Sequence, residues 1–317
     1  MRRLLQTSAL LALFPYLGIV YLLVTGTASW SSFAYVVAIG ALLGGLATLP
    51  DPARKSGRRR GLSRGAVLAL ATVALVRAFV AGDGRRLRVD GAGGEGLRPR
   101  TSTSRLVNRL LDEGDVAVAG TRVLVASGMV RDDVLTLPSA MTDAYRNMRR
   151  YEGEAPSPFV ATYLGLERPD AFDLVLVEAP RTGETTASPR TALLFLHGYA
   201  GNFDLPCGQL ACAVASTGVV TACPSTRWVG DWWSADGEAI LRRTVEILHA
   251  RGVDRIVLAG LSNGGYGASR LAPRMKGTFA GLVTLDAGHF AMLVRGEESD
   301  RAVREFVAAR VETRASR

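Results

Sequence analysis

The chain has 317 residues, of which 48% are apolar, so it is long enough for one catalytic domain of ordinary size and an additional segment. Its formal charge of +9 arises in the first third, because residues 1–105 hold 15 Arg/Lys and 4 Asp/Glu, whereas residues 106–317 hold 23 and 25. A domain that binds nucleic acid is itself basic, so the near-neutral second part excludes nucleic acid as its partner. The basic residues instead flank apolar segments, a pattern typical of membrane proteins.

Two uncharged apolar runs open the chain. Residues 4–24 match the roughly 20 residues of a bilayer span and exceed the apolar core of a signal peptide. A second run covers residues 33–49, and a basic stretch at residues 54–64 follows it. Because basic segments stay in the cytoplasm, we expect a transmembrane hairpin with both ends inside.

A third apolar run covers residues 65–82 and contains Arg77 near one end, from where a charged group can reach the membrane interface. We favour a third span here, which would place the rest of the chain outside the cytoplasm. The alternative is a helix lying in the interface, which would leave the rest of the chain in the cytoplasm. Residues 1–82 are thus predicted to form a multi-pass transmembrane region, in a bacterial inner membrane.

Residues 83–105 are rich in Gly, Arg, Ser and Thr and lack apolar periodicity, which predicts a flexible linker. Residues 91–96 match the dinucleotide-binding pattern G-x-G-x-x-G, but no buried strand precedes them and no helix follows, so no nucleotide cofactor is implied. A globular domain then covers residues 106–317. It opens with three predicted elements: a helical piece at 106–111, a strand of alternating apolar residues at 116–125 and a helix at 139–151.

The core of this domain, residues 172–317, alternates apolar strands with helices. Strands are expected at residues 172–177, 191–196, 218–223, 255–259 and 281–285. Helices are expected at residues 206–216, from a Ser234 or Asp236 cap to residue 251, from residue 264 onward, and at residues 300–311. This alternation predicts an α/β fold with a doubly wound, mostly parallel sheet.

One motif combines a nucleophile with the strand-to-helix turn that would expose it. The strand at 255–259 runs directly into Gly260-Leu261-Ser262-Asn263-Gly264, and a helix starts at once. A serine on such a tight turn projects above the sheet, and the glycines two residues before and after it leave room for the turn. A second motif, His197-Gly198-Tyr199-Ala200-Gly201, follows the strand at 191–196 in the same way.

Together these motifs resemble the α/β-hydrolase superfamily, over about residues 172–307. The resemblance implies that Ser262 is the nucleophile and that the backbone N–H groups of Tyr199 and Asn263 form the oxyanion hole. It also implies that His289 is the base, because this histidine lies after a late strand and before the last helix. The other two histidines are His197, which belongs to the oxyanion-loop motif with a structural role, and His249, which lies late in a helix.

The chain departs from the family pattern between the nucleophile and the base. Only 26 residues separate Ser262 from His289, so the fold is expected to be shortened at its C-terminal end and the usual loop for the triad acid is missing. Asp286 is the first candidate for the acid, with Asp231 and Asp204 as alternatives.

The resulting functional prediction is a membrane-anchored serine hydrolase that cleaves a carboxylic ester, of a small molecule or a lipid, through an acyl-enzyme on Ser262. No metal or organic cofactor is implied. Aromatic residues near the motifs are predicted to line an apolar substrate pocket: Tyr199, Phe203, Trp232, Trp233, Tyr266 and Phe290. The alternative is a membrane-tethered, noncatalytic binding or scaffold protein built on a degraded hydrolase fold.

The three cysteines, Cys207, Cys212 and Cys223, show no metal-ligand spacing. They are expected either as small buried core residues or, if the domain faces an oxidising compartment, as one disulfide with one remaining thiol. The sequence leaves the pairing open.

Overall fold

The computed structural model describes residues 2–24, 30–47, 65–73, 76, 86–90, 107–108, 112–131, 136–152, 157–177, 190–201, 204–285, 301 and 304–305. The chain divides into two compact units, one made of residues 1–81 and 109–142 and the other of residues 82–108 and 143–317.

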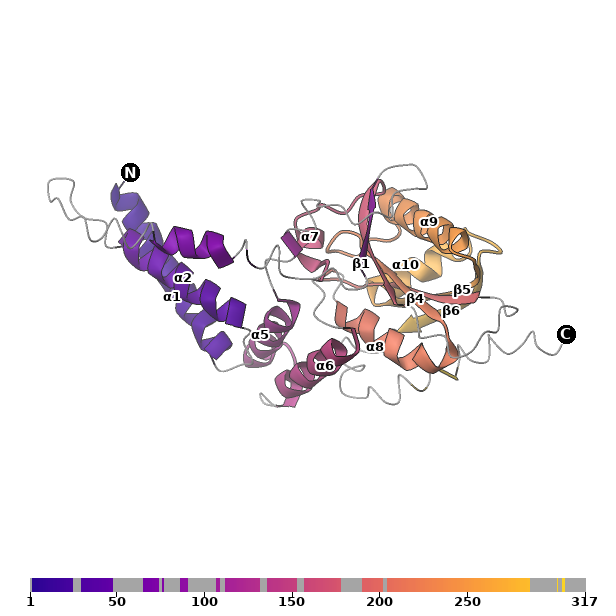
Figure 1. Cartoon of the computed structure of the whole chain (residues 1–317), viewed down its shortest axis with the longest axis horizontal. Helices are drawn as coiled ribbons and strands as arrows, with labels where there is room; N and C mark the ends of the chain where they lie inside the picture. Colours follow the sequence, from indigo (N-terminus) through magenta and orange to yellow (C-terminus); the bar gives the residue numbers. More distant parts are fainter. Residues whose placement is uncertain are drawn as a thin grey trace. The chain divides into compact units, whose positions relative to one another are not determined.

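The first unit is helical. It contains α1 (Arg2–Val24), α2 (Trp30–Ala47) and α5 (Glu113–Ala126), and α1 and α2 lie side by side (Figure 1). The Tyr16 hydroxyl on α1 donates a hydrogen bond to the Val36 carbonyl oxygen on α2, at 2.7 Å. A Cβ atom at Gly40 would overlap the Tyr16 ring, so this glycine permits the close approach of the two helices. Within the described part of the chain, no helix has the combination of length and hydropathy that crossing a membrane requires.

Residues 116–125 form most of α5, so the predicted strand is wrong. The helix has a strong N-terminal signal, because the Asp112 carboxylate accepts a hydrogen bond from the Asp115 N–H at 3.1 Å and acidic residues occupy the first turn. The buried positions Val118, Thr121 and Val125 recur at helical spacing. The prediction of a helix at residues 139–151 is confirmed by α6 (Thr136–Glu152).

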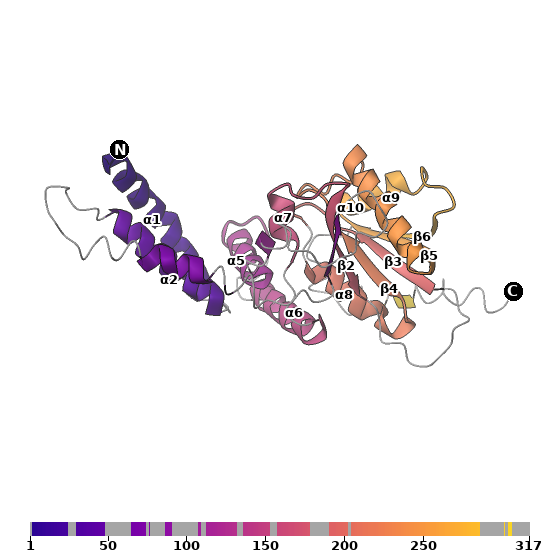
Figure 2. The ribbon, with the colours of Figure 1, turned by 45° about the horizontal axis from the view of Figure 1, so that its top comes forward.

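In the second unit, the described residues form a six-stranded sheet in the order β1-β2-β4-β3-β5-β6 (Figure 2). The strands are β1 (Arg86–Asp90), β2 (Ala171–Val177), β3 (Arg190–Leu196), β4 (Val220–Pro224), β5 (Val253–Leu261) and β6 (Phe279–Leu285). The pairs β3–β4, β3–β5 and β5–β6 are parallel, whereas β2 runs antiparallel to both β1 and β4. The predicted α/β fold with a mostly parallel sheet is therefore confirmed. The predicted linker is wrong over residues 86–90, because these five residues pair with β2.

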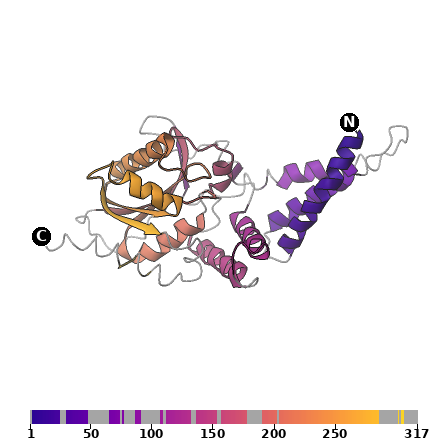
Figure 3. The same cartoon turned by 180° about the vertical axis from the view of Figure 1, so that it is seen from behind.

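Helices cover both faces of this sheet. Because successive side chains of a strand point to opposite faces, the strands contribute to two apolar clusters. One cluster packs against α9 (Ala235–Ala250) and α10 (Asn263–Leu271), and the other packs against α8 (Asp204–Val214). Figure 3 shows this arrangement from behind, with α8 on the opposite side of the sheet from α9 and α10. The helices start close to their predicted positions, and the Ser234 hydroxyl caps α9 by accepting from the Gly237 N–H at 3.1 Å.

A buried polar network anchors the short helix α7 (Phe159–Tyr163), which precedes β2. The Asn108 side chain accepts from the Ala161 N–H at 2.8 Å and donates to the Asp173 carboxylate on β2 at 2.7 Å. The Asp173 N–H in turn donates to the Glu167 carboxylate at 2.7 Å. All three side chains are buried, so α7 is held against the sheet by groups that water does not reach.

The structure resolves the cysteine pairing that the sequence left open. Cys207 on α8 and Cys223 on β4 form a disulfide, and both are buried. Cys212 lies outside the disulfide and its side chain is exposed. The bond joins residues 16 apart, and cross-linking a loop of that length stabilises a fold by about 3 kcal/mol in the chain-entropy description.

Candidate active site

Ser262 lies at the turn between β5 and α10, where its backbone has φ 53° and ψ −118°. A positive φ is uncommon for a residue with a side chain, and among the described non-glycine residues Ala200 is the only other one. The Ser262 carbonyl oxygen accepts from the Tyr266 N–H at 2.9 Å in the first turn of α10, and the Ser262 N–H donates to the Leu285 carbonyl oxygen of β6 at 3.3 Å. The turn is therefore fixed on both sides by main-chain hydrogen bonds.

Both motif glycines lie where a side chain would collide with backbone. A Cβ atom on Gly260 would come within 2.6 Å of the Gly265 nitrogen, and one on Gly264 would come within 2.6 Å of the Leu196 carbonyl carbon. The short distance at Gly260 shows that the strand-to-helix turn is tight, as the motif predicted. The short distance at Gly264 shows that the start of α10 lies directly against the end of β3.

The loop after β3 reaches the same serine. A Cβ atom on Gly198 would lie 3.1 Å from the Ser262 Cβ and 2.8 Å from the Leu261 carbonyl oxygen. The structure thus brings together Gly198-Tyr199 and Ser262-Asn263, the two segments that carry the predicted oxyanion donors. Asn263 is the first residue of α10, where the helix dipole favours negative charge.

His197 is a buried structural residue. Its Nε2 accepts a hydrogen bond from the Thr226 N–H at 3.1 Å, so the proton is on Nδ1, which donates to the Gly198 carbonyl oxygen at 2.8 Å. Burial lowers the pKa of His197 from 6.5 to about 4, so the ring is neutral at neutral pH. The Trp232 indole N–H also donates to the His197 carbonyl oxygen at 2.8 Å, which ties this loop to the loop after β4.

His249 lies far from Ser262 along the sheet. Its Nδ1 lies 2.8 Å from the carbonyl oxygen of Val253, the first residue of β5, whereas Ser262 follows the last residue of that strand. Nine residues of extended chain span roughly 30 Å. His289, Asp286, Phe203 and Phe290 lie outside the described residues.

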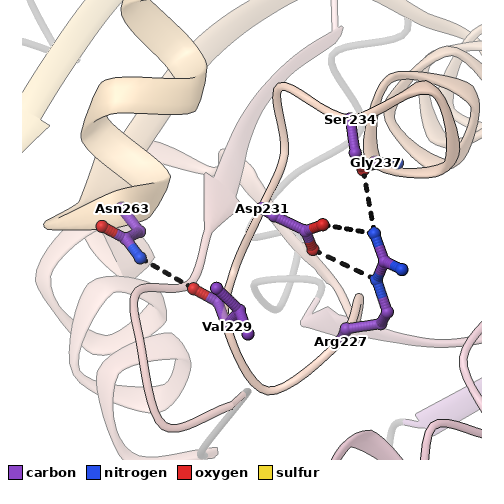
Figure 4. A network of polar contacts seen from close by, with 6 residues as sticks. All are labelled: Arg227, Val229, Asp231, Ser234, Gly237 and Asn263. Atoms are coloured by element: carbon purple, nitrogen blue, oxygen red, sulfur yellow. Dashed lines mark hydrogen bonds and ion pairs between the residues drawn. The ribbon is translucent and has the colours of Figure 1, made fainter.

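The structure describes both alternative acids, Asp231 and Asp204. Asp231 is paired with the Arg227 guanidinium, whose Nε donates to it at 3.3 Å and whose Nη2 makes a shorter contact (Figure 4). Asp204 is buried in the first turn of α8. The described residues contain no group of His, Cys, Asp and Glu side chains arranged to hold a metal ion.

The predicted pocket residue Trp232 does not line a surface. Its ring is fully buried in the core cluster under α9 and α10, so this prediction is wrong. A Cβ atom on Gly267 of α10 would come within 3.2 Å of the Trp232 Cγ, which shows how closely the helix packs on the ring. A tryptophan beside a motif is as well suited to the core as to a pocket, and the sequence carries no signal that separates the two.

Two groups of partly exposed aromatic rings lie beside the candidate site. Trp233 packs edge-to-face on Tyr266, with ring centroids 5.0 Å apart, and the Arg270 guanidinium donates to the Tyr266 hydroxyl at 2.8 Å. On the oxyanion-loop side, Tyr199 packs edge-to-face on Trp228 at 4.9 Å. Trp228 also stacks on Tyr163 of α7, at 6.1 Å.

Tyr163 and Trp228 were missed by sequence reasoning. Trp228 follows a buried strand within a loop that also holds Trp232, which is a weak signal, whereas nothing around Tyr163 points to the site. Partial burial, and secondarily the neighbouring Tyr199, raise the pKa of Tyr163. Both phenol rings pack on Trp228, so they share one surface although they are distant in the sequence.

Comparisons with known proteins give structural likenesses only. No protein-family model matches the chain, and no curated protein matches it. One similar solved structure is a substrate-bound fluorophosphonate-binding serine hydrolase F from Staphylococcus aureus, with 16% identity and a TM-score of 0.32, covering 39% of this chain and 55% of that one. The chain thus spans about half of that protein's length.

Two further structures show likeness of the same order. A structure described as a thioesterase, from a Silicibacter species, has 20% identity and a TM-score of 0.29, with 57% of this chain and 69% of that one covered. Brefeldin A esterase, described as a bacterial homologue of human hormone-sensitive lipase, has 15% identity and a TM-score of 0.28, with 73% of each chain covered. At these TM-scores the likeness carries no argument about this chain.

Proposed function

We propose that the protein is a serine hydrolase that cleaves a carboxylic ester through an acyl-enzyme on Ser262. The strained backbone of Ser262 carries this proposal. A non-glycine residue at positive φ costs on the order of 1–3 kcal/mol and persists only where its surroundings impose it. Here it coincides with a strand-to-helix turn and with the close approach of Gly198, which is the geometry that a nucleophilic serine requires.

The proposed oxyanion hole consists of the backbone N–H groups of Tyr199 and Asn263. Their segments meet at Ser262, and the N-terminus of α10 adds a favourable field for negative charge. Each such donor contributes on the order of 3 kcal/mol to stabilising the tetrahedral intermediate.

The proposed base is His289, supported by elimination among the three histidines of the chain. His197 is neutral, buried and engaged through both ring nitrogens, and His249 lies at the far end of β5 from Ser262. Asp286 remains the proposed acid, since Asp231 is already paired with Arg227. His289 would take the Ser262 proton and return it to the leaving alcohol.

The aromatic surfaces support an apolar substrate. Large aromatic rings are exposed next to the segments that carry the proposed nucleophile and oxyanion donors. They belong to Tyr199, Trp228 and Tyr163 on one side and to Trp233 and Tyr266 on the other. Such rings bind apolar acyl or alcohol groups of a small-molecule or lipid ester. No cofactor takes part in this mechanism.

We further propose that residues 1–82 anchor the protein in a membrane and that the hydrolase domain faces away from the cytoplasm. The anchor rests on the apolar runs and their basic flanks in the sequence, and not on the helices of the described residues, none of which meets the requirement for crossing a membrane. The Cys207–Cys223 disulfide supports the orientation, because structural disulfides persist in oxidising compartments. A reporter fused after Arg317 tests this proposal: alkaline phosphatase activity supports it, and fluorescence of a cytoplasm-restricted reporter contradicts it.

Labelling with a fluorophosphonate probe tests the proposed chemistry. The full-length protein should be labelled, and Ser262→Ala should abolish the labelling. Ser269→Ala is the matched control, because this hydroxyl bonds to the Gly265 carbonyl oxygen within α10 and takes no part in the site. Absence of labelling in the folded wild type would refute the hydrolase and favour the noncatalytic binding or scaffold protein.

A further inference from the structure

The loop after β4 contacts both halves of the proposed oxyanion hole. We name residues 225–231 the clamp loop; they connect β4 to the segment before α9. The inference drawn from its contacts rests on the proposed function, because it concerns how the two oxyanion donors are held at a fixed separation.

The first half of the hole is the loop that carries Tyr199. Gly230 of the clamp loop has φ +66°, and a Cβ atom there would lie 2.7 Å from the Gly198 carbonyl oxygen. At the start of the clamp loop, the Thr226 N–H donates to His197 Nε2 at 3.1 Å. These contacts fix the residues directly before Tyr199 to the clamp loop, and Trp228 of the same loop packs edge-to-face on the Tyr199 ring.

The second half of the hole is Asn263. Its side-chain Nδ2 donates to the Val229 carbonyl oxygen of the clamp loop at 2.8 Å (Figure 4). The residue whose backbone N–H is the proposed donor is therefore tied, through its own side chain, to the loop that packs on the other donor segment. The bond crosses 34 positions of sequence, so local turn geometry does not account for it.

Internal contacts stiffen the clamp loop. The Gly230 N–H donates to the Arg227 carbonyl oxygen at 2.8 Å, which closes a turn, and the Arg227 guanidinium pairs with Asp231. The same guanidinium lies 3.5 Å from the Ser234 hydroxyl that caps α9 (Figure 4). The loop is thereby connected to a helix that belongs to the core.

We infer that the clamp loop sets the separation of the two oxyanion donors and that Asn263, through its side-chain amide, is the positioning residue. The Asn263 side chain acts on its own backbone N–H and on the loop, so its loss should weaken binding of the developing oxyanion more than binding of the ground-state ester.

Kinetics of Asn263 variants test this inference. Asn263→Ala should lower kcat by about 10- to 100-fold, less than the 10²- to 10³-fold loss of an oxyanion donor itself, with KM changed by less than about threefold. Asn263→Asp should lower kcat further, because a carboxylate would face the Val229 carbonyl oxygen. Rates are normalised by active-site titration, so that a smaller folded fraction does not imitate the effect.

A transition-state analogue separates positioning from a general structural role. The affinity of a trifluoromethyl ketone should fall in Asn263→Ala by the same factor as kcat/KM, whereas Ser269→Ala should change neither. An unchanged kcat, or a rise of KM alone, would overturn the inference.

Amide hydrogen exchange gives a test that does not depend on turnover. In Asn263→Ala, the peptide covering residues 225–234 should exchange faster than in the wild type, and in Ser269→Ala it should not. If the wild type proves inactive, the proposed function fails, while the exchange result still decides the coupling of Asn263 to the clamp loop. Equal exchange in all three proteins would overturn that coupling.

Discussion

Replacing Asp231 with asparagine distinguishes two roles for this side chain. If Asp231 supports the clamp loop by pairing with Arg227, the neutral variant loses an ion pair. If it were the triad acid, the variant would lose the group that orients the catalytic histidine. The two roles predict effects of very different size.

The structure gives the size of the smaller effect, the loss of the ion pair between Arg227 and Asp231. The Arg227 side chain is 44% exposed and that of Asp231 is 16% exposed, so their ion pair contributes on the order of 1 kcal/mol or less. If all of that were lost from the transition state, kcat would fall by less than about tenfold. Loss of a triad acid lowers kcat by about 10⁴-fold. We therefore expect Asp231→Asn to retain more than about a tenth of the wild-type kcat.

Ester hydrolysis at saturating substrate, normalised by fluorophosphonate titration, measures this difference. Glu238→Gln is the control, because Glu238 pairs with Arg242 on α9 at the same spacing and with similar exposure, 15% and 49%, and also pairs with Arg274. Glu238→Gln should lose at least as much stability as Asp231→Asn, because it loses two ion pairs, while it should keep full activity. A loss near 10⁴-fold in a normally folded Asp231→Asn protein would instead identify Asp231 as the triad acid.

Two further predictions concern backbone packing and titration. Gly264→Ala should lower the free energy of unfolding by about 3 kcal/mol and abolish labelling of Ser262, because its Cβ would lie 2.6 Å from the Leu196 carbonyl carbon. The control is Gly120→Ala in α5, where no atom lies within 4 Å of the added Cβ, and it should stabilise the protein by up to about 1 kcal/mol. Equal thermal shifts of the two variants would contradict this prediction. The pKa of His197 is about 4 in the fold and 6.5 in the unfolded chain, so the unfolded state binds the proton first as pH falls. About 3 kcal/mol of stability, present above pH 6.5, should therefore be lost between pH 6.5 and 4. Urea titrations measure the free energy of unfolding against pH, and this dependence should be flatter for His197→Gln than for the wild type. The same pH dependence in both proteins would show that His197 is not the group responsible.

The strand and helix pattern of the second unit was predictable from the sequence, because its strands are short apolar runs and its helices have clear caps. The same reasoning failed at residues 116–125, where small apolar residues alternate like a strand but a capped first turn forms α5. It also missed β1, since nothing in the composition of residues 86–90 marks a strand and pairing with β2 supplies the structure.

Local sequence features were enough to predict the turn at Ser262, because its geometry is fixed by the neighbouring glycines and by the strand that precedes it. The partners of each side chain, by contrast, depend on how the chain folds in three dimensions. The tertiary structure buried Trp232 while exposing Trp228 and Tyr163, paired Cys207 with Cys223, and joined Asn263 to Val229. These outcomes depend on segments that the sheet brings together from distant positions, and the local periodicity of the sequence carries no information about such contacts.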